Sequence, residues 1–402
     1  MKIRKVSLID AVLIIYILCA IVTDEGSVSM QCARLLLVAM FGCVFVKKPI
    51  IEKNMFVCWL FLFWLFSVLS ITWAQNQTIA SAMSKTLFIN AICMYAIVYL
   101  INFKTIHLEC ALKACVFAPL LLEIRVIVAA GPMAFLNTRV AGGVSGNTIG
   151  LCAAFGTGMA LYFILQQKSR MLYSMMLILN FFIVVLSSSR KALLCVFIPI
   201  VFVYVFNHKD NFLKNFYKIC IAGLALIIVY FSVLHIPVLY STVGHRIEEM
   251  VAMILGDTSA ADASSMTRFR LIAWGMEWFR EKPWTGHGMD NYRMVLHQYH
   301  PDYPLSYYAH NNYVELLVDG GIIGLILYYW NYVAVFIRGI KYRKNIEKND
   351  MVFIGMLLAL MINEYGLVSY YDKYIQILFA LIWVVIEMLK RKASEDVRFG
   401  GK

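Results

Sequence analysis

The sequence predicts an all-α, polytopic integral membrane protein of about twelve transmembrane helices, with one large extracytoplasmic loop that contains short helices. Three observations predict this class. The 402 residues are 61% hydrophobic and only 15% charged, whereas soluble domains are about 45–50% apolar and about 25% charged. The apolar residues come in blocks of roughly 17–25, the length that crosses a bilayer as a helix. Lys and Arg concentrate in alternate short loops, the pattern typical of an oriented membrane protein.

The whole chain, 1–402, is expected to form a single membrane domain. Its first apolar block, Val6–Val22, follows a basic start and has no small-residue cleavage site, so we expect it to remain as the first span. The connections 23–30 and 74–78 contain no Lys or Arg, whereas the alternate ends are basic, and this places both termini in the cytoplasm. The predicted spans are 6–22, 30–46, 55–73, 79–101, 108–130, 147–165, 171–188, 190–206, 217–235, 313–337, 350–368 and 374–390.

The net charge of +12 does not indicate a nucleic-acid partner, because the basic residues follow the alternating loops. The ten cysteines all lie in or beside apolar blocks. This placement argues against a disulfide framework or a cysteine-based metal site. We interpret the cysteines as small apolar residues that fill space between helices.

One connection is long. It spans residues 236–312, between the ninth and tenth predicted spans, and the predicted topology places it outside the cytoplasm. Its many aromatic residues indicate a folded segment, and long loops of this kind are usually functional. A helix is expected over Met266–Glu281, ended by Pro283 and by Gly286 and Gly288. Its apolar face is predicted to contain Phe269, Ile272, Ala273, Met276 and Phe279.

Several basic side chains lie on the outer side of the predicted topology. They include Lys85, Arg125, Arg139, Arg190 and Lys191, together with the loop residues Arg246, Arg268, Arg270, Arg280, Lys282 and Arg293. Charges at this depth are costly unless they pair or line a wet cavity. A cluster of arginines here would suit the diphosphate of a lipid carrier, because the guanidinium makes bidentate contacts and stays charged.

A structural interpretation competes with that one. A single Arg at a helix end is more often an interfacial side chain than a ligand. For Lys85 and Arg125 the structural interpretation is favoured, with Glu123 or Asp319 as the expected partner of Arg125. For Arg190 the sequence leaves the two interpretations balanced.

Five of the eight histidines fall in the loop or at its end, namely His245, His287, His297, His300 and His310. The spacing of His297 and His300 lacks the i,i+4 pattern and the Glu of zinc hydrolases, so no metal site is expected. A histidine can instead accept a proton from an attacking hydroxyl. The tyrosines around them suit either sugar rings or the membrane interface.

The order of short motifs resembles the O-antigen ligase and O-antigen polymerase family of bacterial envelope glycosyltransferases. The resemblance covers roughly residues 130–330, and no single motif carries it alone. Arg139-Val-Ala-Gly-Gly and Asn147 precede the sixth span, and Ser189-Arg190 opens the eighth. The later motifs are Arg270-x3-Trp274, Pro283-Trp284-Thr285-Gly286-His287-Gly288, and His310-Asn311-Asn312-Tyr313-Val314-Glu315 with Gly320-Gly321 following.

The resemblance implies an inverting, metal-independent glycosyltransferase without cofactors in the bacterial inner (plasma) membrane. Its donor would be an oligosaccharide on undecaprenyl diphosphate, and its acceptor a glycan hydroxyl. Membrane lipid and a chain-length regulator are the other candidate partners. The resemblance implies catalytic roles for His310, Arg190 and Arg270, with His310 as the general base. Substrate-binding roles fall to Arg139, Lys191, Arg268, Asn311 and Tyr313. Arg270 is preferred to Arg268 because its spacing to Trp274 fits the family pattern.

The predicted reaction is polymerisation of the repeat units of a surface polysaccharide, such as a capsule, an exopolysaccharide or O-antigen. Three alternatives stay open. A ligase would move the glycan to a lipid-anchored or cell-wall acceptor. A non-enzymatic transporter or flippase would use membrane residues such as Glu109 and Glu364 as a pathway, but the sequence shows no inverted repeat. A binding scaffold is the third alternative.

Overall fold

The computed structural model describes residues 6–47, 54–131, 140–187, 189–206, 263–342 and 349–399, with separate positions between 214 and 235. The N-terminal helices are α1 (Leu8–Val22), α2 (Val28–Lys47), α3 (Met55–Ser70), α4 (Gln77–Ile101) and α5 (Thr105–Ala130). A hairpin of two-residue antiparallel strands, β1 (Val140–Ala141) and β2 (Val144–Ser145), follows. Next come α7 (Gly146–Leu165), α8 (Arg170–Leu186) and α9 (Arg190–Val205). The C-terminal helices are α13 (Ala263–Glu281), α14 (Tyr292–Tyr299), α15 (Asn312–Lys341), α16 (Met351–Asn363), the 3₁₀ turn η4 (Glu364–Gly366) and α17 (Lys373–Phe399).

The described chain is all-α apart from the short hairpin, which confirms the all-α part of the predicted fold class. Each predicted span coincides with a described helix, except the ninth, 217–235, which lies largely outside the described residues. The loop segment 236–262, with Arg246 and His245, also lies outside them. Among the described helices, α2, α4, α7 and α15 have the length and composition to cross a membrane. The count of about twelve spans stays a prediction.

Polar residues set the starts of the apolar helices. Ser7 and Asp10 form a reciprocal capping box at α1. The side-chain oxygen of Asn76 caps α4 by accepting hydrogen bonds from the backbone N–H groups of Thr78 and Ile79. Asn311 caps α15 in the same way. Each cap satisfies amide donors that would otherwise lack a partner at the helix end, and so fixes where the chain leaves the connection and enters the bundle.

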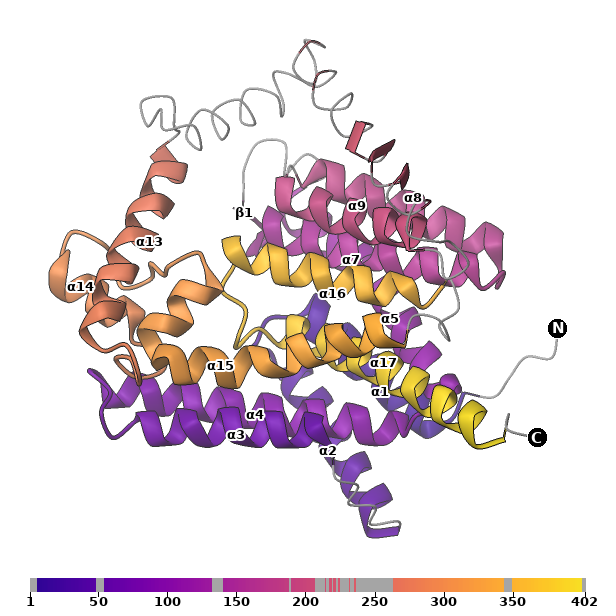
Figure 1. Ribbon diagram of the computed structural model, residues 1–402, viewed down its shortest axis with the longest axis horizontal. Helices are drawn as coiled ribbons and strands as arrows, with labels where there is room; N and C mark the ends of the chain where they lie inside the picture. Colours follow the sequence, from indigo (N-terminus) through magenta and orange to yellow (C-terminus); the bar gives the residue numbers. More distant parts are fainter. Residues whose placement is uncertain are drawn as a thin grey trace.

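The helices form two groups with α15 between them (Figure 1). In one group α7 packs against α8 and α9, and α9 packs against α16. In the other, α3 packs against α4, and α2 packs against α1 and α4. Helix α5 contacts both α1 and α7 and so joins the groups. Helices α13 and α14 lie at one end of the bundle, and α17 ends at the other.

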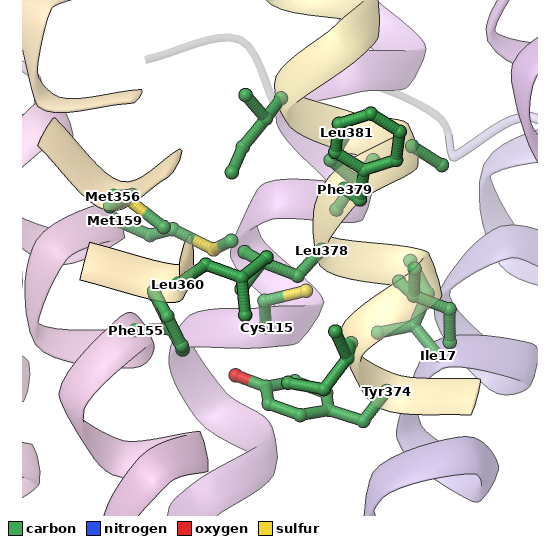
Figure 2. Packing of buried hydrophobic residues seen from close by; sticks show 14 of the residues in the cluster. Ile17, Cys115, Phe155, Met159, Met356, Leu360, Tyr374, Leu378, Phe379 and Leu381 are labelled. Atoms are coloured by element: carbon green, nitrogen blue, oxygen red, sulfur yellow. The ribbon is translucent and has the colours of Figure 1, made fainter. Parts of the chain in front are cut away.

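The core lies where the two groups meet. Figure 2 shows Ile17 of α1, Cys115 of α5, Phe155 of α7, Leu360 of α16 and Leu378 of α17 around one packed volume. All five side chains are fully or almost fully buried. Close packing of this kind holds helices from distant parts of the chain in register. It therefore fixes the relative positions of the helix ends that carry the polar residues.

Helix α15 is broken at Gly321, which has φ 63° and ψ −164°. The break frees carbonyl groups in the middle of an apolar helix, and these need donors. The chain after α13 supplies them, because the N–H of His287 donates to Val318 O at 2.8 Å and that of Gly288 to Asp319 O at 2.9 Å. In return the N–H of Ile322 donates to Pro283 O at 2.8 Å. The segment 283–288 is therefore hydrogen-bonded into the break.

Candidate functional site

Asp319 connects the loop to the bundle. Its buried carboxylate accepts the backbone N–H of Tyr292 at 2.7 Å, that of Asp290 at 3.0 Å and the hydroxyl of Tyr370 at 3.0 Å. These donors come from the start of α14 and from the connection before α17. One carboxylate thus links three segments, and a buried carboxylate needs several donors of this kind to offset its lost hydration.

A second set of contacts fixes the loop against the turn between α3 and α4. The indole N–H of Trp73 donates to Thr285 O at 3.1 Å, and the N–H of Gln75 donates to His287 O at 2.9 Å. The N–H of Asn76 donates to the side-chain oxygen of Asn291 at 2.7 Å. The base of the loop is therefore positioned by α3, α4 and α15 together.

His310 lies where the loop returns to the bundle. It adopts a left-handed backbone conformation with φ 55°, which costs a residue with a side chain about 1–2 kcal/mol. Both neighbours hold it there. The N–H of Ala309 donates to the carboxylate of Glu315 at 2.6 Å, and the Asn311 side chain caps α15. The His310 ring packs against the ring of Tyr308, with centroids 4.0 Å apart. Strained backbone of this kind clusters at functional sites.

The His310 side chain lines a cavity of about 170 Å³, called here the His310 cavity. The starts of α7, α9 and α17 meet around it, and α13 contributes Arg268. Helix N-termini carry partial positive charge and bind anions. Other residues that line it are Ser145, Asn147, Thr148, Ser189, Lys191, Tyr308, Asp372 and Tyr374.

Hydrogen bonds tie these helix starts together. The Ser189 hydroxyl donates to the side-chain oxygen of Asn147 at 2.9 Å, which joins the start of α9 to that of α7. Lys191 donates to the carbonyl of Gly366. Asp372 accepts the N–H of Tyr374 at 2.8 Å and so caps α17. The polar wall of the His310 cavity is consequently held by bonds between helices that are far apart in the sequence.

The charges around His310 keep its imidazole neutral. Burial and the nearby positive charges of Arg268 and Lys191 lower the pKa of His310 from 6.5 to about 4. A neutral ring at pH 7 has a lone pair that can accept a proton. The same two cations are suited to an anion in the His310 cavity. The arrangement therefore combines a proton acceptor with a site for negative charge.

The structure distinguishes the two arginines of α13. Arg268 lines the His310 cavity, whereas Arg270 is exposed and is not among the cavity residues. Successive helical residues are about 100° apart, so these two side chains point about 200° apart. The preference for Arg270 stays a prediction, but the geometry favours Arg268 for any group bound beside His310.

The predicted apolar face of α13 is correct only in part, because Ile272, Met276 and Phe279 are partly buried and pack against the loop core. Phe269 is 53% exposed, and the buried stripe consists of Leu271, Gly275 and Trp278. This stripe packs against Tyr292 and Val314, because Trp278 lies 5.4 Å from the Tyr292 ring and Gly275 faces Val314. The tertiary contacts with α14 and α15 thus select the face of α13 that Arg268 extends, three residues before Leu271.

The other predicted site residues have varied positions. Arg190 is the first residue of α9 and is half-buried. Its charge and that of Arg268 both repel the ammonium group of Lys191. The Asn311 amide oxygen is used in capping. Tyr313 donates its hydroxyl to Met361 O at 2.7 Å and stacks on Tyr329. Arg139 lies outside the described residues. Substrate-binding roles for these residues stay predictions.

The described loop histidines other than His310 have structural contacts. His287 is buried, and its ring nitrogen lies 3.1 Å from Trp278 O. His300 stacks on Trp274 with centroids 3.7 Å apart, and the ring of His297 lies 3.3 Å from Tyr303 O. Within the described residues, no group of three or more His, Cys, Asp or Glu side chains is placed to hold a metal ion.

The predicted partner of Arg125 is also wrong. Arg125 pairs with Asp24 at 2.7 Å, and it donates to Val22 O at 2.5 Å. Neither Glu123 nor Asp319 is the acceptor in these bonds. Asp24 lies in the turn after α1, and α1 packs along α5, so the tertiary contact brings in a carboxylate distant in sequence. This pairing agrees with the structural role that the sequence favours for Arg125.

Comparison with known families supplies the remaining observation. Residues 175–329 match the family model described as O-antigen ligase. This segment is similar to the O-antigen ligase family. It runs from α8 to the middle of α15 and includes the break at Gly321, His310 and both arginines of α13. No curated protein matches the chain significantly.

The matched segment contains the part of the His310 cavity formed by α9, α13 and the chain before α15. The family match and the apolar helices together favour a membrane-embedded enzyme of the ligase and polymerase type that acts in polysaccharide assembly. The wall formed by Ser145, Thr148, Asp372 and Tyr374 comes from outside the matched residues. Sequence reasoning did not single out Asp372, whose only local signal is that of a helix cap.

Proposed function

We propose that the protein is an inverting, metal-independent glycosyltransferase of the bacterial inner membrane that polymerises repeat units of a surface polysaccharide. The donor is an oligosaccharide on undecaprenyl diphosphate, and the acceptor is a hydroxyl of another glycan. The observation that carries the proposal is the neutral His310 ring in a cavity that also contains Arg268 and Lys191. A base and an anion site are what this transfer requires.

In the proposed step, an imidazole nitrogen of His310 accepts the proton of the acceptor hydroxyl as its oxygen attacks the anomeric carbon of the donor sugar. The bond between that carbon and the diphosphate oxygen breaks, and undecaprenyl diphosphate leaves with the bonding electrons. A single displacement inverts the anomeric centre. Arg268 and Lys191 stabilise the negative charge that develops on the leaving diphosphate, a role that fixed cations fill without a metal ion.

Arg190 and Arg270 extend this anion site in the proposal. Arg190 precedes Lys191 at the start of α9, where the helix dipole adds to its charge. Arg270 lies on the exposed face of α13, two residues from Arg268. We assign Arg190 to the diphosphate together with Lys191, and we place Arg270 over the carrier or the first sugar.

The proposed topology has about twelve spans, cytoplasmic termini and an outer loop at 236–312. Its support is the alternation of basic loops and the position of α13 and α14 at the bundle end opposite that where α17 ends (Figure 1). The His310 cavity, at the starts of α9 and α17, then faces the side where lipid-linked donors are presented. Labelling of single cysteines in intact cells tests this orientation. An impermeant reagent should label position 262 and should spare position 343.

The assay for the proposed reaction uses the reconstituted protein, the purified undecaprenyl-diphosphate repeat unit and a chelator, without nucleotide. We expect a ladder of longer carrier-linked glycans. A requirement for added Mg²⁺ or a nucleotide sugar would contradict the proposal.

The family description favours a ligase as the second candidate. A ligase would give no ladder from the repeat unit alone and would transfer glycan only when a lipid-anchored or cell-wall acceptor is added. The same preparation therefore distinguishes the two reactions. A protein that moves the lipid-linked donor across vesicles but forms no new glycosidic bond would be a transporter.

A further inference from the structure

A second, larger cavity lies beside the His310 cavity. It encloses about 510 Å³ and is called here the outer-turn cavity, because the turn between α1 and α2 forms one of its walls. The two cavities share Ser145, Thr148, Asp372 and Tyr374. A molecule in the outer-turn cavity therefore meets the same side chains that line the space in front of His310.

The walls of the outer-turn cavity come from helix ends on one side of the bundle. They are the end of α1, the last turns of α5, the hairpin that precedes α7 and the start of α17. Lys373, the first residue of α17, donates to Thr23 O at the end of α1 at 3.3 Å. The cavity therefore lies at the bundle end where α7, α9 and α17 begin, as the His310 cavity does.

The two cavities differ in charge. The His310 cavity contains the cations Lys191 and Arg268 against the single carboxylate of Asp372. In the outer-turn cavity the basic side chains are already paired, since Arg125 lies 2.7 Å from Asp24 and Lys373 lies 2.9 Å from Glu25. A paired cation attracts a diphosphate weakly, because the neighbouring carboxylate repels the phosphate charge. The outer-turn cavity is thus unsuited to the anionic part of the donor.

Its side chains suit an uncharged polyol. Asp24 and Glu25 offer carboxylate acceptors, Arg125 and Lys373 offer N–H donors, and the hydroxyls of Ser145 and Thr148 can do either. The Tyr371 ring, at the same wall, provides an aromatic surface against which the C–H face of a sugar can pack. Sugar rings present many hydroxyls of both kinds, so mixed donors and acceptors match them.

We propose that the outer-turn cavity binds the acceptor glycan and presents its terminal hydroxyl to His310 across the shared wall of Ser145, Thr148, Asp372 and Tyr374. This inference rests on the proposed glycosyl transfer and adds the site and chemistry of the second substrate. The donor diphosphate occupies the cationic His310 cavity, and the acceptor sugars occupy the outer-turn cavity, where both cations are paired with carboxylates. Asp372, on the shared wall, is placed to accept a hydrogen bond from the sugar that carries the attacking hydroxyl.

The test fills the outer-turn cavity without touching His310. Thr86 of α4 lines the outer-turn cavity but not the His310 cavity, so Thr86→Trp should occupy acceptor space. Ile89→Trp is the matched control, because Ile89 lies on the same helix, is 41% exposed and lines neither cavity. A second variant, Tyr371→Ala, removes the aromatic wall and serves if Thr86→Trp folds poorly.

The probe for acceptor binding is the methyl glycoside of the repeat-unit oligosaccharide, which has no diphosphate and cannot act as donor. Thr86→Trp should raise the acceptor KM at least about tenfold, because the larger side chain displaces the acceptor from part of the cavity and from one or two of its hydrogen bonds. The donor KM should stay within about twofold of that of Ile89→Trp. Tyr371→Ala should shift the acceptor KM in the same direction.

The outcomes separate this inference from the proposed function. An inactive wild-type protein in the reconstituted assay would remove the proposed function itself. An active wild type whose Thr86→Trp and Tyr371→Ala variants both keep the acceptor KM of Ile89→Trp would overturn only the acceptor site. A rise confined to the donor KM in Thr86→Trp would assign the outer-turn cavity to the donor glycan and would also overturn the inference.

Discussion

The backbone N–H of Ala309 donates to the carboxylate of Glu315 at 2.6 Å, so the first turn of α15 holds the residue that precedes His310. Glu315 is almost fully buried and lies one helical turn beyond the Asn311 cap. This contact stabilises the left-handed conformation of His310 through the backbone and leaves the imidazole nitrogens available. Glu315 is therefore a positioning residue and not a partner of the ring.

Glu315→Ala should lower kcat by about tenfold to a hundredfold, because a buried N–H without an acceptor costs about 1–3 kcal/mol and the His310 backbone loses its support. Glu315→Gln keeps a side-chain oxygen and should retain most of the activity. Steady-state kinetics of both variants checks this, with donor KM as the internal control. Equal losses in the two variants would mean that the charge, and not the hydrogen bond, matters.

His310→Ala should reduce turnover by roughly 10²–10⁴-fold, the usual contribution of a positioned base. Donor binding should change little, because Arg268 and Lys191 remain. His300→Ala is the matched control, since His300 stacks on Trp274 and lines neither cavity. Membrane level and thermal stability are measured for each variant. Near-normal product from a well-folded His310→Ala protein would remove the base assignment.

Arg268→Ala should weaken donor binding more than Arg270→Ala, because only Arg268 lines the His310 cavity. We expect the donor Kd to rise at least about tenfold for Arg268→Ala, as a charge-assisted bond is lost. Arg268→Lys should restore only part of the affinity, since an ammonium cannot reproduce the bidentate fork. The opposite order of effects would support the residue preferred from the family spacing.

The pH profile should depend on whether the donor is bound. His310 must be neutral to act as base, and its pKa of about 4 in the free protein predicts an acid limb of kcat/KM near that pH. The donor diphosphate offsets the charges of Arg268 and Lys191, so it raises the pKa of His310 and moves the limb of kcat to higher pH. Arg268→Gln should raise the limb of kcat/KM for the same reason. The acid limb should therefore differ between kcat/KM of the wild type, kcat of the wild type and kcat/KM of Arg268→Gln. The same limb in all three would contradict an effect of these charges on the pKa of His310.

Gly321→Ala should destabilise the protein strongly. Its backbone, with φ 63° and ψ −164°, lies in a region essentially restricted to glycine, where a side chain costs about 1–3 kcal/mol, and a Cβ would overlap the carbonyl group of Trp284. Gly42→Ala is the control, because a Cβ at this helical glycine meets nothing within 4 Å. Thermal unfolding in detergent, followed by the fluorescence of Trp284 and its neighbours, compares the two. Equal midpoints would contradict the packing described at the break.

Helix positions were largely predictable because each span is a long apolar block, and such blocks have few alternatives to a helix in a membrane. The break at Gly321 was not predictable, since its support comes from residues 283–288 that are distant in sequence. The preference for Arg270 over Arg268 stays a prediction for a related reason. It followed motif spacing, whereas the orientation of α13 is decided by Leu271, Gly275 and Trp278 packing on α14 and α15.

The candidate site could likewise be predicted from the sequence only in part. His310 was found through motif resemblance, and its neutral state depends on Arg268 and Lys191, which only the fold brings near. Arg125 was assigned a nearby carboxylate in sequence, but helix packing supplies Asp24 instead. The outer-turn cavity had no sequence signal at all, because its walls come from connections that are individually short and ordinary.

The hydrogen bonds at the break in α15 bear on how this protein could be recombined with its relatives. Residues 283–288 donate to Val318 and Asp319, and Asn291 accepts from the turn before α4. A chimera that exchanges only the outer loop would separate these donors from their acceptors and leave buried carbonyls unsatisfied. The smallest transferable unit therefore extends past Gly321 into α15 and brings its own α3–α4 turn. Exchange of the loop alone can therefore change glycan specificity only through segments outside residues 283–291, which are hydrogen-bonded to the bundle.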